Sequence, residues 1–331
     1  MIRRMRRGRI SAALLCAGPI ATGASADAGL AQQSLSDAWW TGPLLAQSAT
    51  TLPAGHLYTE PSLYDSIPYA RLDGAGNEHD VPHENRLGSS LPLKYGVTDR
   101  LAIGATLRFA YDWIAQGPSS SGVGVGDPSI QLQYRVTRYR PDSWMPAFSI
   151  NLQESLPWGR YDRLDRQSDG LGSGSYTTTL ATCFQSFFWM PNGRIVRARM
   201  DLFYAASREV SVRRSSVYGT PDDFSGYARP GGSASLDLAF EYSATRSWVV
   251  ASDFWLERDA ATRVEGAYRI SGRGTIHFLS SSGTGRELIV APAIEYNWSS
   301  RLGVIFGVRI TAVGRNEKGF TTPVAALSYY R

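Results

Sequence analysis

Apolar side chains recur at every second residue between Gly285 and Val313. The alternation covers residues 288–298, stops at the turn 299–301, and resumes over residues 302–312. Residues two positions apart lie on the same face of a strand, so each half predicts a strand with one apolar and one polar face. Globular strands average ~5–6 residues, whereas a tilted strand needs ~9–11 residues to cross a bilayer. The length of both runs therefore predicts a membrane-spanning β-hairpin.

The same alternation recurs along the chain and predicts about twelve strands. It is blurred in the sixth and ninth. Because lipid offers no hydrogen-bond partner to an unpaired sheet edge, we expect a single closed antiparallel transmembrane β-barrel over residues 54–331. The predicted strands are 54–64, 86–97, 101–113, 127–137, 145–156, 175–188, 194–206, 233–242, 248–256, 286–298, 302–312 and 321–330.

The connections between the predicted strands alternate in length. Short connections lie near 98–100, 138–144, 189–193, 244–247 and 299–301, and longer ones at 64–85, 114–126, 157–174, 207–232, 257–285 and 314–320. Short periplasmic turns and longer outer loops are typical of bacterial outer-membrane barrels. An even number of strands places both ends of the barrel on the short-turn side.

Tryptophan positions agree with a bilayer at both ends of the strands. Trp144, Trp189, Trp248 and Trp298 lie beside short turns, and Trp113, Trp158 and Trp255 lie at the opposite strand ends. Indole rings prefer the two membrane–water interfaces, so we expect two aromatic girdles.

The excess of basic residues belongs to the first residues of the chain. Lys and Arg number 34 against 29 acidic residues, and five arginines lie within residues 3–9. Without them the count is 34 − 5 = 29 basic against 29 acidic residues, so the charge gives no reason to expect a nucleic-acid partner.

This basic start leads into an apolar stretch, residues 10–17, and then Ala24-Ser25-Ala26. The order is that of a secretory signal peptide, so we expect residues 1–26 to be cleaved, with Ala31 as the weaker alternative site. After cleavage Cys183 is the remaining cysteine, and no internal disulfide can form.

Residues 27–53 are irregular and carry the adjacent pair Trp39 and Trp40. One hypothesis is a periplasmic segment that folds into the barrel as a plug, because two indoles favour burial or an interface. The other is a loosely ordered mature N-terminus. The sequence leaves both open.

The polar positions of the predicted strands identify the side chains expected to line the lumen. They carry mixed charge, which favours either a pathway whose charges tune passage or a plugged lumen whose charges pair with one another. The candidates are Arg108, Gln131, Arg135, Arg197, Arg199, Asp237, Glu241, Glu295 and Arg309.

Candidate chemistry is sparse. The glycine-rich stretch 122–127 lacks the spacing of a phosphate loop and leads into a predicted strand rather than a helix. No nucleophile motif with a histidine partner is present, so we expect no catalytic residues, no enzyme activity and no cofactor. His79-Asp80 and His83-Glu84 have side chains that can bind a metal, and the sequence does not decide whether this loop does so.

Several short motifs in a fixed order resemble the meta-pathway phenol-degradation outer-membrane proteins. The motifs are Trp39–Leu45, Leu52–His56 leading into Glu60-Pro61, Gly124–Pro128, Leu156–Gly159 and Pro292–Asn297. The resemblance spans most of the mature chain and implies an outer-membrane β-barrel that passes hydrophobic or aromatic compounds. The chain departs from the usual barrel ending, because Arg331 follows the aromatic pair Tyr329-Tyr330.

Together the pattern and the resemblance predict a bacterial outer-membrane channel for passive uptake of small, hydrophobic or aromatic compounds. The expected partners are outer-membrane lipid, the small-molecule solute and the outer-membrane assembly machinery. The alternative is a structural or surface-interaction barrel with a plugged lumen that acts through its extracellular loops.

Overall fold

A computed structural model describes residues 32–270 and 274–331. The expected signal peptide, residues 1–26, lies outside this range. Within the described residues, no helix is both long enough and apolar enough to span a membrane. Two short 3-10 helices, η1 (Leu35–Asp37) and η2 (Gln167–Asp169), accompany a structure otherwise made of strands and their connections.

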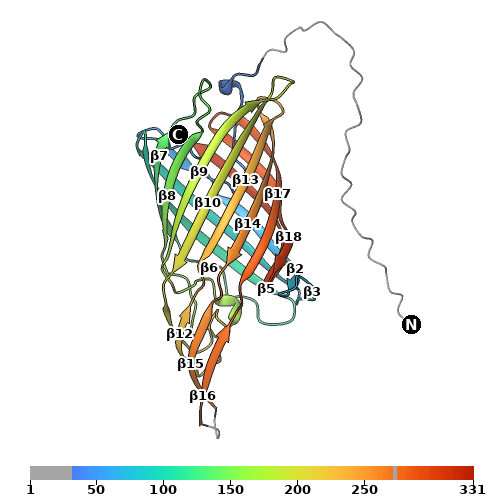
Figure 1. Ribbon diagram of the computed structural model, residues 1–331. Coiled ribbons are helices and arrows are strands. Elements are labelled where there is room, and N and C mark those ends of the chain that lie inside the picture. The colour runs from blue at the N-terminus through green and yellow to red at the C-terminus, as the bar shows by residue number, and fades with distance from the viewer. Residues whose placement is uncertain (1–31, 271–273) are drawn as a thin grey trace, which may run out of the picture. The chain divides into compact units, whose positions relative to one another are not determined.

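The predicted closed antiparallel barrel is confirmed (Figure 1). Each strand of the wall pairs with its neighbours in the chain, and β19 pairs with both β1 and β2, which closes the ring. The strands of the wall are β1 (Leu57–Thr59), β2 (Ser62–Leu72), β4 (Glu84–Thr98), β5 (Leu101–Ile114), β7 (Ser129–Thr137), β8 (Ala147–Ser155), β9 (Thr177–Trp189), β10 (Ile195–Ser207), β13 (Ser233–Ser243), β14 (Trp248–Asp259), β17 (Gly285–Ser299), β18 (Leu302–Arg315) and β19 (Glu317–Tyr330).

β1 and β2 together form the first of the twelve strands of the wall. They are interrupted at Glu60-Pro61, where proline has no N–H to donate to a ladder. Two-residue strands, β3 (Glu78–His79) and β6 (Gly124–Val125), add to this sheet beside β2 and β5.

The two faces of the wall follow the predicted alternation. On β18, Phe306 is 54% exposed on the outer face, whereas its neighbour Ile305 is 1% exposed and points inward. The outer face is a belt of exposed apolar side chains that includes Leu63, Leu87, Ile103, Leu132, Leu202, Phe254 and Ile294. An apolar outer band around polar inner positions is the pattern of a membrane barrel.

Two of the seven tryptophans expected in the girdles lie instead on the inner face. Trp189 donates its indole N–H to the backbone oxygen of Gln33 at 2.9 Å. Trp255 shares its face with buried Asp253, and its ring centroid lies 5.1 Å from that of Phe203. The girdle assignment was wrong for these two because position along the strand does not report which face a side chain occupies.

The connections at the long-loop end differ from the prediction in two ways. The expected loop 314–320 is a turn at Asn316 alone, since β18 ends at Arg315 and β19 begins at Glu317. Asn316 has φ 54°, the left-handed conformation that asparagine tolerates. The expected loops 207–232 and 257–285 contain strands.

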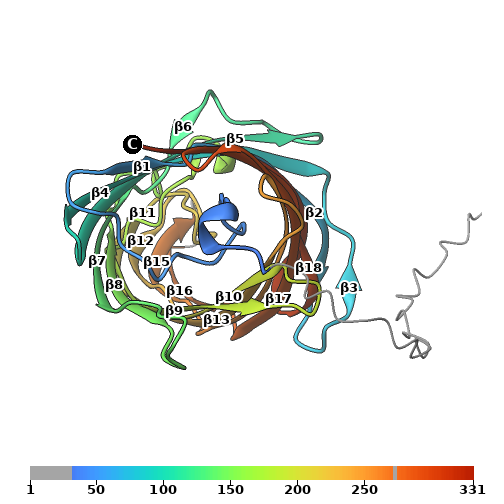
Figure 2. The same ribbon diagram turned by 90° about the horizontal axis from the view of Figure 1, so that it is seen from above.

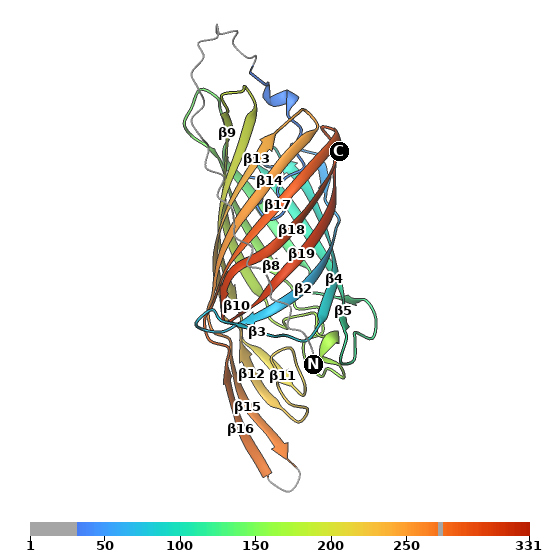
Figure 3. The same cartoon turned by 90° about the vertical axis from the view of Figure 1, so that its right-hand side faces the viewer.

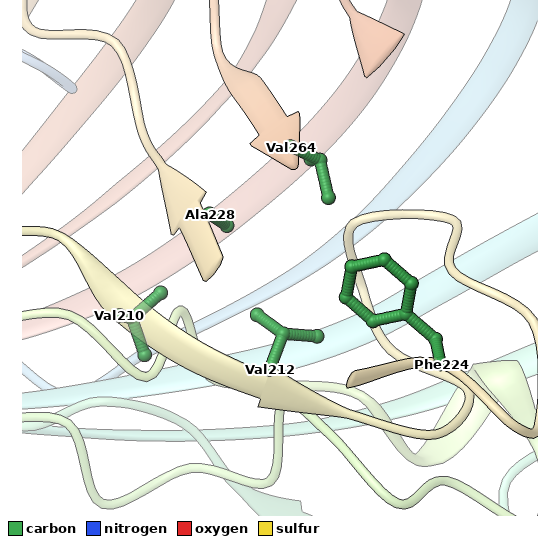
Figure 4. Packing of buried hydrophobic residues seen from close by; sticks show 5 residues of the cluster. All are labelled: Val210, Val212, Phe224, Ala228 and Val264. Carbon is green, nitrogen blue, oxygen red and sulfur yellow. The ribbon is translucent and has the colours of Figure 1, made fainter. Parts of the chain in front are cut away.

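These strands form a second sheet in the order β11 (Val210–Arg213), β12 (Ser225–Arg229), β15 (Arg263–Ile270) and β16 (Gly274–Ser281). They adjoin β10, β13, β14 and β17 in the chain, so the small sheet repeats the strand order of that part of the wall (Figure 3). One face buries a cluster of Val210, Val212, Phe224, Ala228 and Val264 (Figure 4).

A carboxylate joins two of the remaining long loops, those that contain Ser121 and Asp169. Asp169, in the loop 156–176, accepts the backbone N–H and the hydroxyl of Ser121 at 2.8 and 3.0 Å. The backbone hydrogen bond from Ser121 lowers the pKa of Asp169 below its ordinary value. This contact holds two loops together at the long-loop end of the barrel.

Candidate functional site

The lumen is crossed by the N-terminal segment, residues 32–53, which Figure 2 shows inside the ring of strands. It begins at the short-turn end, where the N–H of Gln33 donates to the oxygen of Gly193 and the N–H of Trp39 donates to the oxygen of Arg246. It leaves the barrel at the same end, near the short turn between β4 and β5. There the hydroxyl of Thr51 donates to the backbone oxygen of Asp99. Between these points it runs through the barrel.

Carboxylates of the wall accept the backbone N–H groups of this segment. Glu295 accepts from Thr41 at 2.7 Å, and Asp201 accepts from Gln47 at 2.6 Å. Asp253 accepts from three consecutive residues, 44–46, at 3.0 to 3.2 Å. Hydrogen bonds to charged acceptors are stronger than those between neutral groups, so these carboxylates fix the path of the segment.

Glycines of the wall leave space for the segment. A Cβ placed on Gly307 would lie 2.7 Å from Cδ1 of Leu44, and one on Gly303 would overlap the hydroxyl of Thr41. Leu44 packs against Ile305 and the surrounding alanines. Gly42 has φ 126°, a backbone conformation that residues with a side chain rarely adopt. Glycine at this position therefore permits the bend that leads to Leu44.

Trp40 lies against the predicted charged positions of β10. The guanidinium carbon of Arg197 is 4.6 Å from the centroid of the Trp40 ring. Arg197 donates its Nε–H to Glu241 at 2.6 Å, and Arg199 forms an ion pair with the same carboxylate at 3.1 Å. Arg199 also donates to the backbone oxygen of Ala46 at 3.1 Å. Arg197 thus contacts the segment through a cation–π interaction, and Arg199 contacts it through a hydrogen bond.

Amide side chains of β7 and β8 also contact the segment. Gln131 and Asn151 both donate to the side-chain oxygen of Gln47, at 3.0 and 2.7 Å. Gln133 donates to the backbone oxygen of Ser48 at 2.7 Å. The segment is therefore hydrogen-bonded to β7 and β8 as well as to β10, β14 and β17.

Cavities lie on both sides of the segment. One, of about 430 Å³, is lined by Trp40, Leu45, Lys94 and Arg197 among others. The second, of about 440 Å³, is lined by Tyr64, Arg108 and Arg309 among others. Leu44, Glu60 and Pro92 line both cavities. The lumen thus holds two chambers that meet beside one residue of the segment.

The remaining predicted lumen positions also lie on the inner face, and no hydrogen bond joins their side chains to the described part of the segment. Arg108 donates to the backbone oxygen of Asp127 at 2.9 Å, and the guanidinium of Arg309 lies 5.5 Å from the Tyr64 ring. Asp237 is fully buried opposite Asp201. Arg135 shares its face with the buried residue Gln133, close to the turn at Arg100. The structure therefore brings together Trp40, Gln131, Arg197, Arg199, Glu241 and Glu295 around the segment.

The two histidines considered for metal binding have separate partners. His79 contacts Asp73 at 3.0 Å, and this hydrogen bond, with others from Asn77, lowers the pKa of Asp73 well below its ordinary value. His83 packs edge-on against Trp113 at 5.5 Å. Among the described residues, no group of His, Cys, Asp and Glu side chains is arranged to hold a metal ion.

Asp253 was missed among the predicted site residues, although it makes the most hydrogen bonds to the segment. Its strand, β14, reads Trp-Val-Val-Ala-Ser-Asp-Phe-Trp, in which both faces carry apolar residues. Asp253 is the acidic residue within an otherwise apolar stretch of this strand. That placement of a carboxylate in a predicted membrane strand was the available signal.

A family described as "Putative MetA-pathway of phenol degradation" matches residues 80–322. No curated protein matches the sequence.

Among solved structures, the COG4313 outer membrane channel from Pseudomonas putida F1 is 12% identical, with 87% of this chain and 100% of that chain covered and a TM-score of 0.60. A TodX monoaromatic hydrocarbon channel with two deletions is 14% identical, with 91% and 97% covered and a TM-score of 0.42. The first of these likenesses supports the barrel fold.

Proposed function

The chain belongs to this phenol-degradation family, and from that premise we propose that it is an outer-membrane channel for passive uptake of small hydrophobic or aromatic compounds. This role requires no catalytic step and no cofactor. Its partners are outer-membrane lipid around the apolar belt, the solute, and the machinery that assembles such barrels. The short turns then face the periplasm and the long loops face outside.

The observation that carries the proposal is the pair of cavities on either side of one crossing segment. Both cavities combine apolar and polar walls. Leu44, Ile289 and Phe320 line the cavity of about 440 Å³, which we call the outer cavity. Trp40, Leu45 and Leu52 line the cavity of about 430 Å³, which we call the periplasmic cavity. The apolar side chains give a small hydrophobic or aromatic molecule a surface to pack against beside the charged groups of the wall. A path for such solutes needs displacement of one short stretch rather than a change in the barrel.

We infer that the N-terminal segment is the plug of this channel. Hydrogen bonds to charged groups contribute about 1.5–3 kcal/mol each, so the five backbone donors of residues 41–47 gain about 7–15 kcal/mol. Ordering the backbone costs about 1–2 kcal/mol per residue, or about 7–14 kcal/mol for these seven residues. These two free energies are of similar size. This balance favours a segment that can leave its position while the ring of strands stays intact.

Uptake of a radiolabelled aromatic hydrocarbon by bacterial cells that lack another channel for it tests the function. Cells that express the protein should accumulate the compound faster than cells with an empty vector. A variant lacking residues 37–45 should accumulate it faster still. Equal uptake in all three strains, with folded barrel present in the outer membrane, would contradict the proposal.

The second sheet favours the alternative role, which is a barrel with a plugged lumen that acts through its extracellular loops. Its uncovered face carries Tyr227 and Leu279, which are 58% and 79% exposed, in a hollow of about 1060 Å³. This role predicts no uptake and no conductance in either form of the protein. It also predicts that deletion of β15 and β16 removes function while the barrel still folds.

A further inference from the structure

Two arginines of the outer cavity have no acidic partner. Arg108 on β5 and Arg309 on β18 both line the cavity of about 440 Å³. Three other inward arginines are paired: Arg197 and Arg199 share Glu241, and Arg86 binds Asp112. Arg135, near the short-turn end, has no ion pair with a described carboxylate but does not line this cavity. Neither Arg108 nor Arg309 forms an ion pair with any described carboxylate.

Both guanidiniums keep donors for a ligand. The Arg309 guanidinium forms no hydrogen bond to a described residue, and because its Nε is buried, the donors that can meet a ligand are those of Nη1 and Nη2. Arg108 uses Nη1, which donates to the oxygen of Asp127 at 2.9 Å and contacts the Ser129 hydroxyl at 3.4 Å. Arginine has five N–H donors arranged in a fork that matches a carboxylate. Guanidinium N–H groups that line a cavity without a protein partner can bind an anionic ligand there.

Tyr64 on β2 lies between the two arginines. Its ring faces the guanidinium of Arg309 at 5.5 Å, and with Arg108 it also lines a neighbouring cavity of about 320 Å³. The electron-rich face of the ring attracts the cation and limits its orientation. Tyr64 therefore holds Arg309 toward the outer cavity. Tyr64 and Arg108 line both the outer cavity and this neighbouring cavity of about 320 Å³.

The rest of the cavity wall fits an apolar ring. Leu44, Ile289, Phe320 and Val324 line it, and its volume lies in the range of small-molecule sites, about 300–1,000 Å³. An aromatic ring can pack on these side chains while its acidic substituent meets the guanidiniums. A purely aliphatic or neutral solute would leave both arginines without a partner.

Acidic side chains limit the charge of the ligand. Glu60, Glu287 and Glu317 line the same cavity, together with Lys318, whose Nζ is paired with Glu84 at 2.6 Å. Glu60 accepts the Tyr58 hydroxyl at 2.6 Å, and Glu287 accepts from the Thr311 hydroxyl at 3.4 Å. Because like charges repel, a second carboxylate on the ligand would be disfavoured. The wall therefore selects one negative charge.

We propose that Arg108, Arg309 and Tyr64 form a binding site in the outer cavity for the carboxylate of a small aromatic monoacid. The site rests on the proposed function only for the route by which the solute reaches it. It adds to that function a class of solute, an aromatic ring with a single carboxylate, and a place where the solute pauses above the plug.

Titration calorimetry of the full chain in detergent micelles tests the site with benzoate, phenol and phthalate as probes. Benzoate should bind, and Arg309→Gln should weaken it by roughly 10-fold or more, the loss expected for a charge-assisted hydrogen bond. Arg108→Gln should act in the same direction. Phenol, without a carboxylate, and phthalate, with two, should each bind at least ~10-fold more weakly than benzoate.

Arg315→Gln is the matched control, since it removes an exposed arginine from the same strand outside the cavity lining. It should leave benzoate affinity unchanged. Heat-modifiable electrophoretic migration verifies that each barrel is folded; if Arg108→Gln does not fold, Arg309→Gln and Arg309→Lys decide, with lysine giving an intermediate loss.

Equal affinity in the wild type and Arg309→Gln, or no binding of benzoate by the wild type, would overturn the site. These outcomes leave uptake of neutral hydrocarbons untouched. Failure of uptake with normal benzoate binding would instead refute the channel and keep the site.

Discussion

The carboxylate of Asp253 accepts the backbone N–H of Ala46 at 3.0 Å, although 207 positions separate the two residues in the chain. The same carboxylate binds the N–H groups of Leu44 and Leu45. One side chain in the middle of β14 thus holds three consecutive residues of the N-terminal segment inside the barrel. The segment's position depends on the charge of this group.

Asp253→Asn should loosen the segment without opening the barrel. The amide keeps the shape of the side chain but loses the charge, and hydrogen bonds to charged groups contribute about 1.5–3 kcal/mol. Hydrogen exchange of the amides of residues 44–46 should then accelerate by roughly 10- to 100-fold. Asp142→Asn, in an exposed short turn, serves as the control. Unchanged exchange in Asp253→Asn would show that the carboxylate does not hold the segment.

Phe306→Arg should destabilise the barrel through its outer face. Phe306 is 54% exposed in the apolar belt, and a charge near the bilayer midplane costs ~2–4 kcal/mol. Ser66→Arg, which adds the same charge to a position lining the outer cavity, should cost clearly less. Denaturant titration of folding into lipid vesicles measures both. The reverse ranking would refute the assignment of the two faces.

Contact between the two long loops should weaken at low pH. The pKa of Asp169 is lowered from its ordinary value of 3.8, so its contribution is complete above that value and is lost as the pH falls below 3.8 through the lowered pKa. Hydrogen exchange near Ser121, corrected for intrinsic rates, should show less protection at pH 2.5 than at pH 5. Asp169→Asn should lack this difference, and a pH dependence that persists in the variant would point to another group.

The connection between β11 and β12 should be accessible from outside the cell. Gly219 lies in a turn of this connection with φ 72°, and a Cβ at this position would meet no described atom within 4 Å apart from its chain neighbours. An epitope inserted after Gly219 should be labelled on intact cells, because long loops face outward in such barrels. Labelling that requires a broken outer membrane would reverse the orientation.

Most of the wall could be predicted from the sequence because alternation directly reports which side chains meet lipid. The hairpin of β17 and β18 follows its predicted ranges closely, and the inward direction of Ile305 follows from period two. The contact of Ile305 with Leu44 could not be predicted, since it joins the wall to an irregular segment with no periodicity.

The features that were missed have physical reasons of the same kind. The short strands of the second sheet carry polar residues such as Arg229 and Glu265 on the uncovered face, so in the sequence they resemble loops. Asp253 was overlooked because its neighbours are apolar on both faces of β14. Which carboxylates meet the segment depends on its path through the lumen, and local pattern carries no information about that path.

Single-channel conductance in planar bilayers tests the central claim most directly, that the N-terminal segment closes an otherwise passable lumen. The wild type and a variant lacking residues 37–45 are compared after both are verified as folded barrels. If the segment is the plug, the variant should conduct several-fold more than the wild type, because the two cavities beside Leu44 then join. Equal conductance in the two proteins would contradict the account.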